Sequence, residues 1–121
     1  MSSTARTLLL VNRLPRNLQL LADFLAKEGY PTVSASSYEE IDRALANSPL
    51  AVALVDITGF DAEIWARCEQ LRMAEIPFLV VSPRQSAAIQ QASFSHGAKG
   101  VMVKPLVVKE LIGVIQSLLE E

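Results

Sequence analysis

The stretch LLLVNRLPRNL, residues 8–18, joins a short apolar run to the start of a helical pattern. The run from 7 to 11 does not alternate polar with apolar residues, which is typical of a strand covered on both faces of a parallel sheet. Pro15 is favoured in a first helical turn, and leucines then follow at helical spacing at Leu14, Leu18, Leu21 and Leu25. The stretch therefore predicts a buried strand that leads directly into a helix with one buried leucine face.

Four further segments repeat this arrangement along the chain. Apolar runs at 51–55, 78–82 and 100–103 predict buried strands, and the weaker run at 31–35 predicts a strand at a sheet edge. Ser37 and Glu40 form a capping-box pattern that predicts the start of the second helix. Five strand–helix units with right-handed crossovers predict a doubly wound α/β fold, with residues 1–121 as a single domain.

The composition of the chain argues against several classes of function. Half of the 121 residues are hydrophobic and the formal net charge is −2, which is ordinary for a globular chain and argues against direct nucleic-acid binding by this segment. We find no signal peptide and no apolar run long enough to cross a membrane, and the lone Cys68 suits a reducing compartment. We therefore expect a cytoplasmic protein. The sequence carries no dinucleotide or Walker motif, so we do not expect an enzyme.

Polar side chains follow the apolar runs at the points where the predicted strands end. They are Asn12 and Arg13 after the first strand, Asp56 after the third, Ser82 at the end of the fourth and Lys104 after the fifth. Taken singly, each has an ordinary explanation as a turn, helix-start or surface residue. Ligands of open α/β sheets bind beyond the carboxyl ends of the strands, so together these residues predict a functional rim.

The chain resembles the receiver domains of two-component response regulators over nearly its whole length. The motifs that carry the resemblance are LLLVNR, ALVDI, LVVS and, most specifically, HGAKGVMVKP. The resemblance implies a flavodoxin-like (βα)5 fold with strand order 2-1-3-4-5. It also implies phosphotransfer from a partner histidine kinase to Asp56, with Lys104 contacting the phosphoryl group and Ser82 shifting towards it.

Asn12 and Arg13 stand where the family has two acids that help to hold Mg²⁺. An amide is a poor substitute for a carboxylate, and arginine stays protonated and cannot bind a cation. We therefore expect no metal ligands and no cofactor, with Mg²⁺ binding weak at best. Two alternatives remain for Arg13: its guanidinium pairs with Asp56 in place of the metal, or it turns to solvent over the helix start.

Three other pocket positions depart from the family pattern. Thr58 lies in a loop, DITGFDAEIW, that lacks the usual proline and is expected to follow a different path. Pro83 follows the hydroxyl of Ser82, where the family has a small residue. Val101 replaces the aromatic residue that commonly changes rotamer. The pocket is therefore expected to lack both the metal and the conformational reporter.

The last helix, VVKELIGVIQSLLEE from 107 to 121, carries an apolar arc of roughly 160°, wider than one sheet face requires. We predict a homodimer or partner contact centred on Val108, Ile112 and Leu119, formed without phosphorylation. The alternative is that the fourth helix, with Ile89 and Phe94, covers the excess apolar surface.

Three functions remain open from the sequence. The first is a receiver module of a phosphorelay in which phosphorylation of Asp56 is weak or absent. The second is a phosphorylation-independent pseudo-receiver that serves as an interaction or dimerisation module. The third is a sensor that binds a small anion at the strand ends. Fold alone does not choose among them, because function depends on the site.

Overall fold

The computed structural model describes residues 6–120 as five strands that alternate with five helices. The strands are β1 (Leu8–Val11), β2 (Thr32–Ala35), β3 (Val52–Asp56), β4 (Phe78–Ser82) and β5 (Gly100–Val103). The helices are α1 (Pro15–Lys27), α2 (Tyr38–Asn47), α3 (Ile64–Met73), α4 (Ala87–Ser95) and α5 (Val108–Leu119). This alternation is the one that the sequence predicts.

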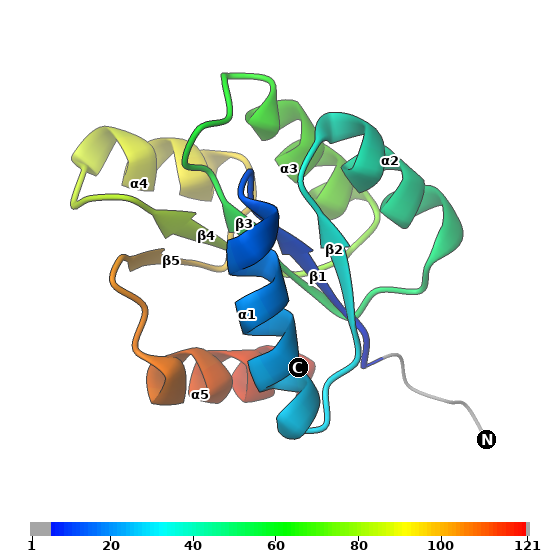
Figure 1. Cartoon of the computed structure of the whole chain (residues 1–121). Coiled ribbons are helices and arrows are strands. Elements are labelled where there is room, and N and C mark those ends of the chain that lie inside the picture. The colour runs from blue at the N-terminus through cyan, green and yellow to red at the C-terminus, as the bar shows by residue number, and fades with distance from the viewer. Residues whose placement is uncertain (1–5, 121) are drawn as a thin grey trace.

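The strands form one parallel sheet in the order β2-β1-β3-β4-β5. Helices α2, α3 and α4 cover one face of the sheet, and α1 and α5 cover the other (Figure 1). The flavodoxin-like fold, its strand order and the edge position of β2 are therefore confirmed. All strands point the same way, so their carboxyl ends share one rim of the sheet.

The two faces of the sheet each have their own apolar core. Every residue of β1, β3 and β4 is buried, as expected for strands with helices on both sides. One core joins the sheet to α2 and α3 through residues such as Ile41 and Leu71. The other joins it to α1 and α5 through residues such as Leu25 and Ile115. This rigid centre fixes the positions from which the rim residues project.

The first helix begins one residue later than its leucine pattern suggests. Leu14 is the extended N-cap residue and is 58% exposed, so its predicted place on the buried face is wrong. The backbone at Leu14 has not yet turned into the helix, which directs its side chain away from the face formed by Leu18 and Leu25. Leu21 is half-buried on that face.

The predicted cap of the second helix is confirmed. The Ser37 hydroxyl oxygen accepts a hydrogen bond from the Glu40 N–H at 3.1 Å. The Glu40 carboxylate accepts the N–H of Ser36 at 2.7 Å rather than that of Ser37, which extends the cap by one residue. Among the described helices, none is both long and apolar enough for a membrane span.

Candidate functional site

Asp56 lies at the end of the central strand β3 and is 7% exposed. Its Oδ1 accepts the N–H of Thr58 at 3.0 Å, and its Oδ2 accepts the side-chain amide of Asn12 at 3.1 Å. The ammonium Nζ of Lys104 lies 2.7 Å from the same Oδ2. Both oxygens of the nearly buried carboxylate are therefore hydrogen-bonded, and its charge is paired with a cation.

Lys104 reaches Asp56 from the end of β5, across the end of the intervening strand β4. Its ammonium also donates a hydrogen bond to the Thr58 hydroxyl oxygen at 3.0 Å. Thr58 consequently holds both members of the ion pair, the carboxylate through its N–H and the lysine through its hydroxyl. The lysine side chain is 33% exposed, so the pair lies at the boundary between core and solvent.

Asn12 follows β1, which pairs with β3 in register and so places the asparagine beside Asp56. Its Nδ2 donates to Asp56, whereas its Oδ1 accepts the N–H of Leu14 at 2.9 Å. The amide oxygen, the atom that could bind a cation, is thus engaged at the start of α1. Asn12 therefore stabilises the carboxylate by donation, while its oxygen accepts a hydrogen bond at the start of α1.

Nitrogen donors surround the Asp56 carboxylate at this rim. Over residues 6–120, no group of three or more His, Cys, Asp or Glu side chains is arranged to hold a metal. Mg²⁺ requires several oxygen ligands in near-octahedral geometry, and here Oδ2 of Asp56 faces two nitrogen donors instead. In this structure the carboxylate is paired with the ammonium of Lys104 and the side-chain amide of Asn12.

Arg13 does not contact Asp56, so the first of its two alternatives, an ion pair with Asp56, does not occur in the structure. Its side chain is exposed, with Cζ 5.6 Å from the centroid of the Phe60 ring and Nη1 3.5 Å from the carbonyl oxygen of Ser36. The physical reason is that Lys104 and Asn12 already occupy Oδ2, while Phe60 offers an aromatic face that attracts a guanidinium. The second alternative, Arg13 turned outward over the helix start, is closer to the structure.

Ser82 ends β4 beside Asp56 but is hydrogen-bonded elsewhere. It is 1% exposed, and its hydroxyl donates to the carbonyl oxygen of Arg84 at 2.6 Å. Pro83 follows as a half-buried residue of the bend after β4. Val101 lies half-buried on β5, where it packs against the core beneath α2 and α3. The structure therefore brings Asn12, Asp56, Thr58 and Lys104 into contact and leaves these three at the margin of that cluster.

The same fold and the same sequence pattern occur in known signalling proteins. The chain is 27% identical over 98% of its length to the transcriptional regulatory protein GltR of Pseudomonas aeruginosa and 30% identical over 84% of its length to the heme response regulator HssR of Staphylococcus haemolyticus. It covers 51% and 46% of these proteins, so it spans about half their length.

Solved structures agree with these relatives. A CheY-like response regulator receiver domain from Methanospirillum hungatei superposes with a TM-score of 0.86 at 23% identity, over 95% of this chain and 94% of that one. This chain has the receiver-domain fold of the response regulators. No family model matches the sequence, which agrees with the low identities.

The receiver domain carries an apolar groove next to the Asp56–Lys104 pair. The groove measures about 760 Å³ and lies between α1 and the loop that leads from β5 into α5. Its walls include Leu20 and Phe24 from α1 and the 40%-exposed Val108 from α5. Apolar surface and the charged pair are thus neighbours on the domain surface.

The three residues predicted to form an interface follow one stripe of α5. Val108 lines the α1-side groove, whereas Ile112 and Leu119 are half-buried against the core shared with α1. The alternative in which α4 covers this stripe is wrong, because α4 lies on the opposite face of the sheet (Figure 1). Ile112 and Leu119 pack instead against the core that α5 shares with α1, and Phe94 of α4 stays 50% exposed.

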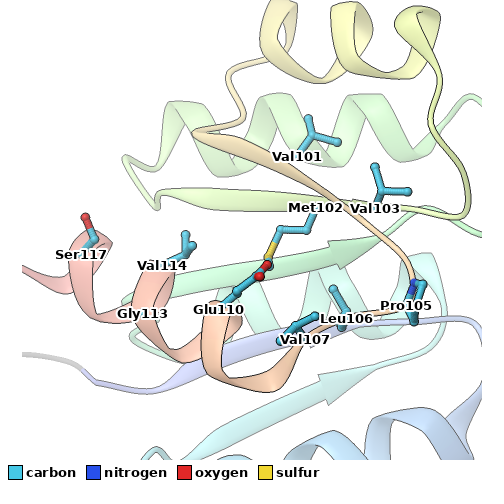
Figure 2. Close-up of a pocket in the computed structure, with 10 residues that line it drawn as sticks. All are labelled: Val101, Met102, Val103, Pro105, Leu106, Val107, Glu110, Gly113, Val114 and Ser117. Carbon is cyan, nitrogen blue, oxygen red and sulfur yellow. The ribbon is translucent and has the colours of Figure 1, made fainter.

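A second groove, of about 640 Å³, runs between β5 and the other side of α5 (Figure 2). Val101 and Val103 project from one face of β5 and Met102 from the other, while Val107 and Val114 contribute from the helix side (Figure 2). β5 pairs only with β4 among the described strands, so this groove borders an open sheet edge. The receiver domain therefore has exposed apolar surface on both sides of α5.

The sequence identified the rim residues but did not predict the contacts of Arg13. Phe60 could have indicated one of them, since an aromatic residue four positions after Asp56 falls in a loop that returns towards the first strand. Ser36 offers only its backbone carbonyl, and a main-chain contact leaves no mark in the sequence. The double role of Thr58 likewise depends on backbone geometry.

Proposed function

We propose that this domain is a signalling module of a two-component phosphorelay in which Asp56 stands at the phospho-acceptor position and is phosphorylated weakly or not at all. The observation that carries the proposal is the pairing of Asp56 Oδ2 with both Lys104 and Asn12 at the strand rim. The carboxylate and lysine of an acceptor site are present, but the acids that would bind Mg²⁺ are replaced by an amide and an exposed arginine. We assign the domain a signalling role rather than an enzymatic one.

The replacement of the metal-binding acids supports a low reactivity of Asp56 towards a phosphoryl group. Phosphoryl transfer depends on neutralising the charge that spreads over the phosphoryl oxygens in the transition state. At this rim the ammonium of Lys104 is already bound to Asp56 and Thr58, and the guanidinium of Arg13 lies against the Phe60 ring rather than beside Asp56. Little positive charge is therefore free to act on an incoming phosphoryl group.

Incubation with acetyl phosphate, with and without Mg²⁺, tests the proposal by intact mass. We expect little or no added phosphoryl mass in either condition, and Asp56→Asn serves as the control that identifies the acceptor. The variant that combines Asn12→Asp with Arg13→Asp should gain Mg²⁺-dependent phosphorylation. Rapid, stoichiometric and Mg²⁺-dependent phosphorylation of the unmodified chain would contradict the proposal.

A second candidate is a pseudo-receiver that binds its partners without phosphorylation. The hydrogen bond from the Ser82 hydroxyl to the Arg84 carbonyl favours it, because this hydroxyl is engaged by its own loop at 2.6 Å rather than free to shift towards Asp56. Under this alternative, Asp56→Asn leaves partner binding unchanged. Under the phosphorelay, the same substitution abolishes the response to the kinase.

The exposed apolar surface beside α5 suits contact with another protein. We propose a histidine kinase or another signalling protein as the partner, and a homodimer through α5 as a second use of this surface. Val108 on one side of the helix and Val107 on the other are 40% and 50% exposed, so each side offers an accessible apolar residue. A cytoplasmic location, without direct binding to nucleic acid or membrane, fits the charge and composition.

A further inference from the structure

The side chain of Arg13 spans the ends of three strands. It starts from the loop after β1, its Nη1 lies 3.5 Å from the Ser36 carbonyl oxygen after β2, and its Cζ lies 5.6 Å from the Phe60 ring centroid after β3. Gly59 packs against its stem, since a Cβ at this glycine would lie 3.4 Å from Arg13 Cγ. One exposed arginine therefore contacts two loops besides its own.

The contact with Phe60 continues into a row of two neighbouring aromatic rings with an arginine at each end. The Phe60 and Tyr38 ring centroids are 5.3 Å apart, and Arg67 Cζ lies 4.5 Å from the Tyr38 ring centroid. Arg67 is fixed in turn by two hydrogen bonds to Asp42, at 2.9 and 3.1 Å. We call Arg13, Phe60, Tyr38 and Arg67 the cation–aromatic row. It links the rim to α2 and α3, whose positions are set by the core.

Phe60 of this row belongs to the turn that orients Asp56, and Arg13 packs against Gly59 of the same turn. The Phe60 N–H donates to the Ile57 carbonyl oxygen at 3.1 Å and closes a turn from 57 to 60, with Gly59 at φ +83°. Thr58 lies inside this turn and donates its N–H to Asp56, while its hydroxyl accepts from Lys104. A group that fixes Gly59 and Phe60 therefore also fixes the two Thr58 atoms that hold the ion pair.

We propose that Arg13 is a positioning residue that fixes the 57–60 turn, so that Thr58 holds the Asp56–Lys104 pair without a metal ion. Arg13 supplies a permanent cation at the rim, and it acts on the loop rather than on the carboxylate. The inference goes beyond the proposed signalling function, because it concerns the unmodified domain and holds whether or not Asp56 accepts a phosphoryl group.

Amide hydrogen exchange measured by NMR tests this role. The N–H groups of Thr58 and Phe60 are hydrogen-bonded within the turn and exchange when the turn opens. We expect Arg13→Ala to accelerate exchange at both amides by roughly fivefold or more, while the amide of Val80 in β4 stays within about twofold of wild type. Arg16→Ala is the matched control, because Arg16 is exposed in the first turn of α1.

Two further variants separate positioning from a general loss of stability. Phe60→Leu removes the ring but keeps apolar bulk, and it should reproduce the local acceleration. Arg13→Ala should also shift the ¹⁵N resonance of the Lys104 ammonium in the same direction as Thr58→Val, which removes the hydroxyl acceptor. Unchanged exchange at Thr58 and Phe60 in Arg13→Ala, or equal acceleration at Val80, would overturn the inference. None of these readouts depends on phosphorylation.

Discussion

The ammonium of Lys104 lies 2.7 Å from Oδ2 of Asp56, although Asp56 ends β3, Lys104 follows β5, and β4 lies between these strands. The carboxylate is 9% exposed at the side chain, whereas the lysine is 33% exposed. Desolvation therefore falls mainly on Asp56, and the pairing offsets that cost.

Replacing Lys104 by methionine should lower the free energy of unfolding by about 1–2 kcal/mol at neutral pH, because it leaves a nearly buried carboxylate without its cation. Combining it with Asp56→Asn should recover most of the loss. Chemical denaturation of the two single variants and the double variant gives the coupling energy. Lys109→Met, at an exposed position of α5, is the control. Additive effects of the two substitutions would show that the pair contributes nothing.

Magnesium titration should give no saturable change in the amide resonances of Asp56 and Thr58 in the unmodified chain, since nitrogen donors occupy the Asp56 carboxylate. The double variant of Asn12→Asp and Arg13→Asp adds two carboxylates and should bind Mg²⁺ measurably more tightly. Asn12→Asp alone separates the two contributions. A sub-millimolar site in the unmodified chain would refute the prediction.

The stability of the domain should fall between pH 10 and pH 12 through Tyr38. Partial burial, and then the hydrogen bond to Asp61, raise the pKa of the Tyr38 phenol to about 12. The folded chain therefore holds a proton that the unfolded chain releases near pH 10, so stability is lost as the pH rises through this range. Absorbance titration of tyrosinate checks the value. Tyr38→Phe should flatten the alkaline fall in stability, and an equal fall in that variant would contradict the assignment.

The hydrogen bond between Tyr38 and Asp61 also affects stability in acid, where stability falls as the pH decreases. The Tyr38 hydroxyl bond holds the pKa of the Asp61 carboxyl below its usual range. The stabilisation from this hydrogen bond is fully present above the ordinary pKa of a carboxyl group, and it is lost as the pH falls through the lowered pKa of Asp61. The stability difference between wild type and Tyr38→Phe should therefore shrink in acid, as measured by denaturation at several pH values. A difference that stays constant would exclude this linkage.

Cys68 should behave as a reporter of unfolding. It is fully buried, and this burial, followed by the charge of Glu69, raises the pKa of its thiol to about 12. A thiol reagent at pH 8 should therefore react at a rate set by opening of the fold, and much faster in denaturant. Rapid labelling of the native chain would show that α3 is more loosely packed than the structure indicates.

Substitutions on the two sides of α5 should locate the dimer contact. If the chain dimerises through the α1 side, Val108→Glu shifts light scattering to the monomer, and if it uses the β5 side, Val107→Glu does so. Both valines are exposed, so neither charge enters the core. Ile112→Glu is less suitable, because Ile112 is half-buried against the core. A monomer at all concentrations, unaffected by either change, would exclude the homodimer.

The sequence by itself determined the alternation of strands and helices, because apolar runs and helical spacing reflect which faces each element buries. It also placed Asp56, Ser82 and Lys104 at strand ends, since parallel strands bring their carboxyl ends to one rim. The sequence also predicted that Ser37 caps the second helix, because this role depends on residues within one helical turn.

Only the tertiary structure decided which rim residues meet. Arg13 and Lys104 are both cations near Asp56, and the choice of lysine depends on the register of β5, the reach of its side chain and the competing face of Phe60. The exposure of Leu14 depended on where the backbone turns into α1, and the α5 stripe packs against the core shared with α1 rather than against α4. These outcomes arise from contacts between segments far apart in the chain, and side-chain spacing within one segment carries no information about them.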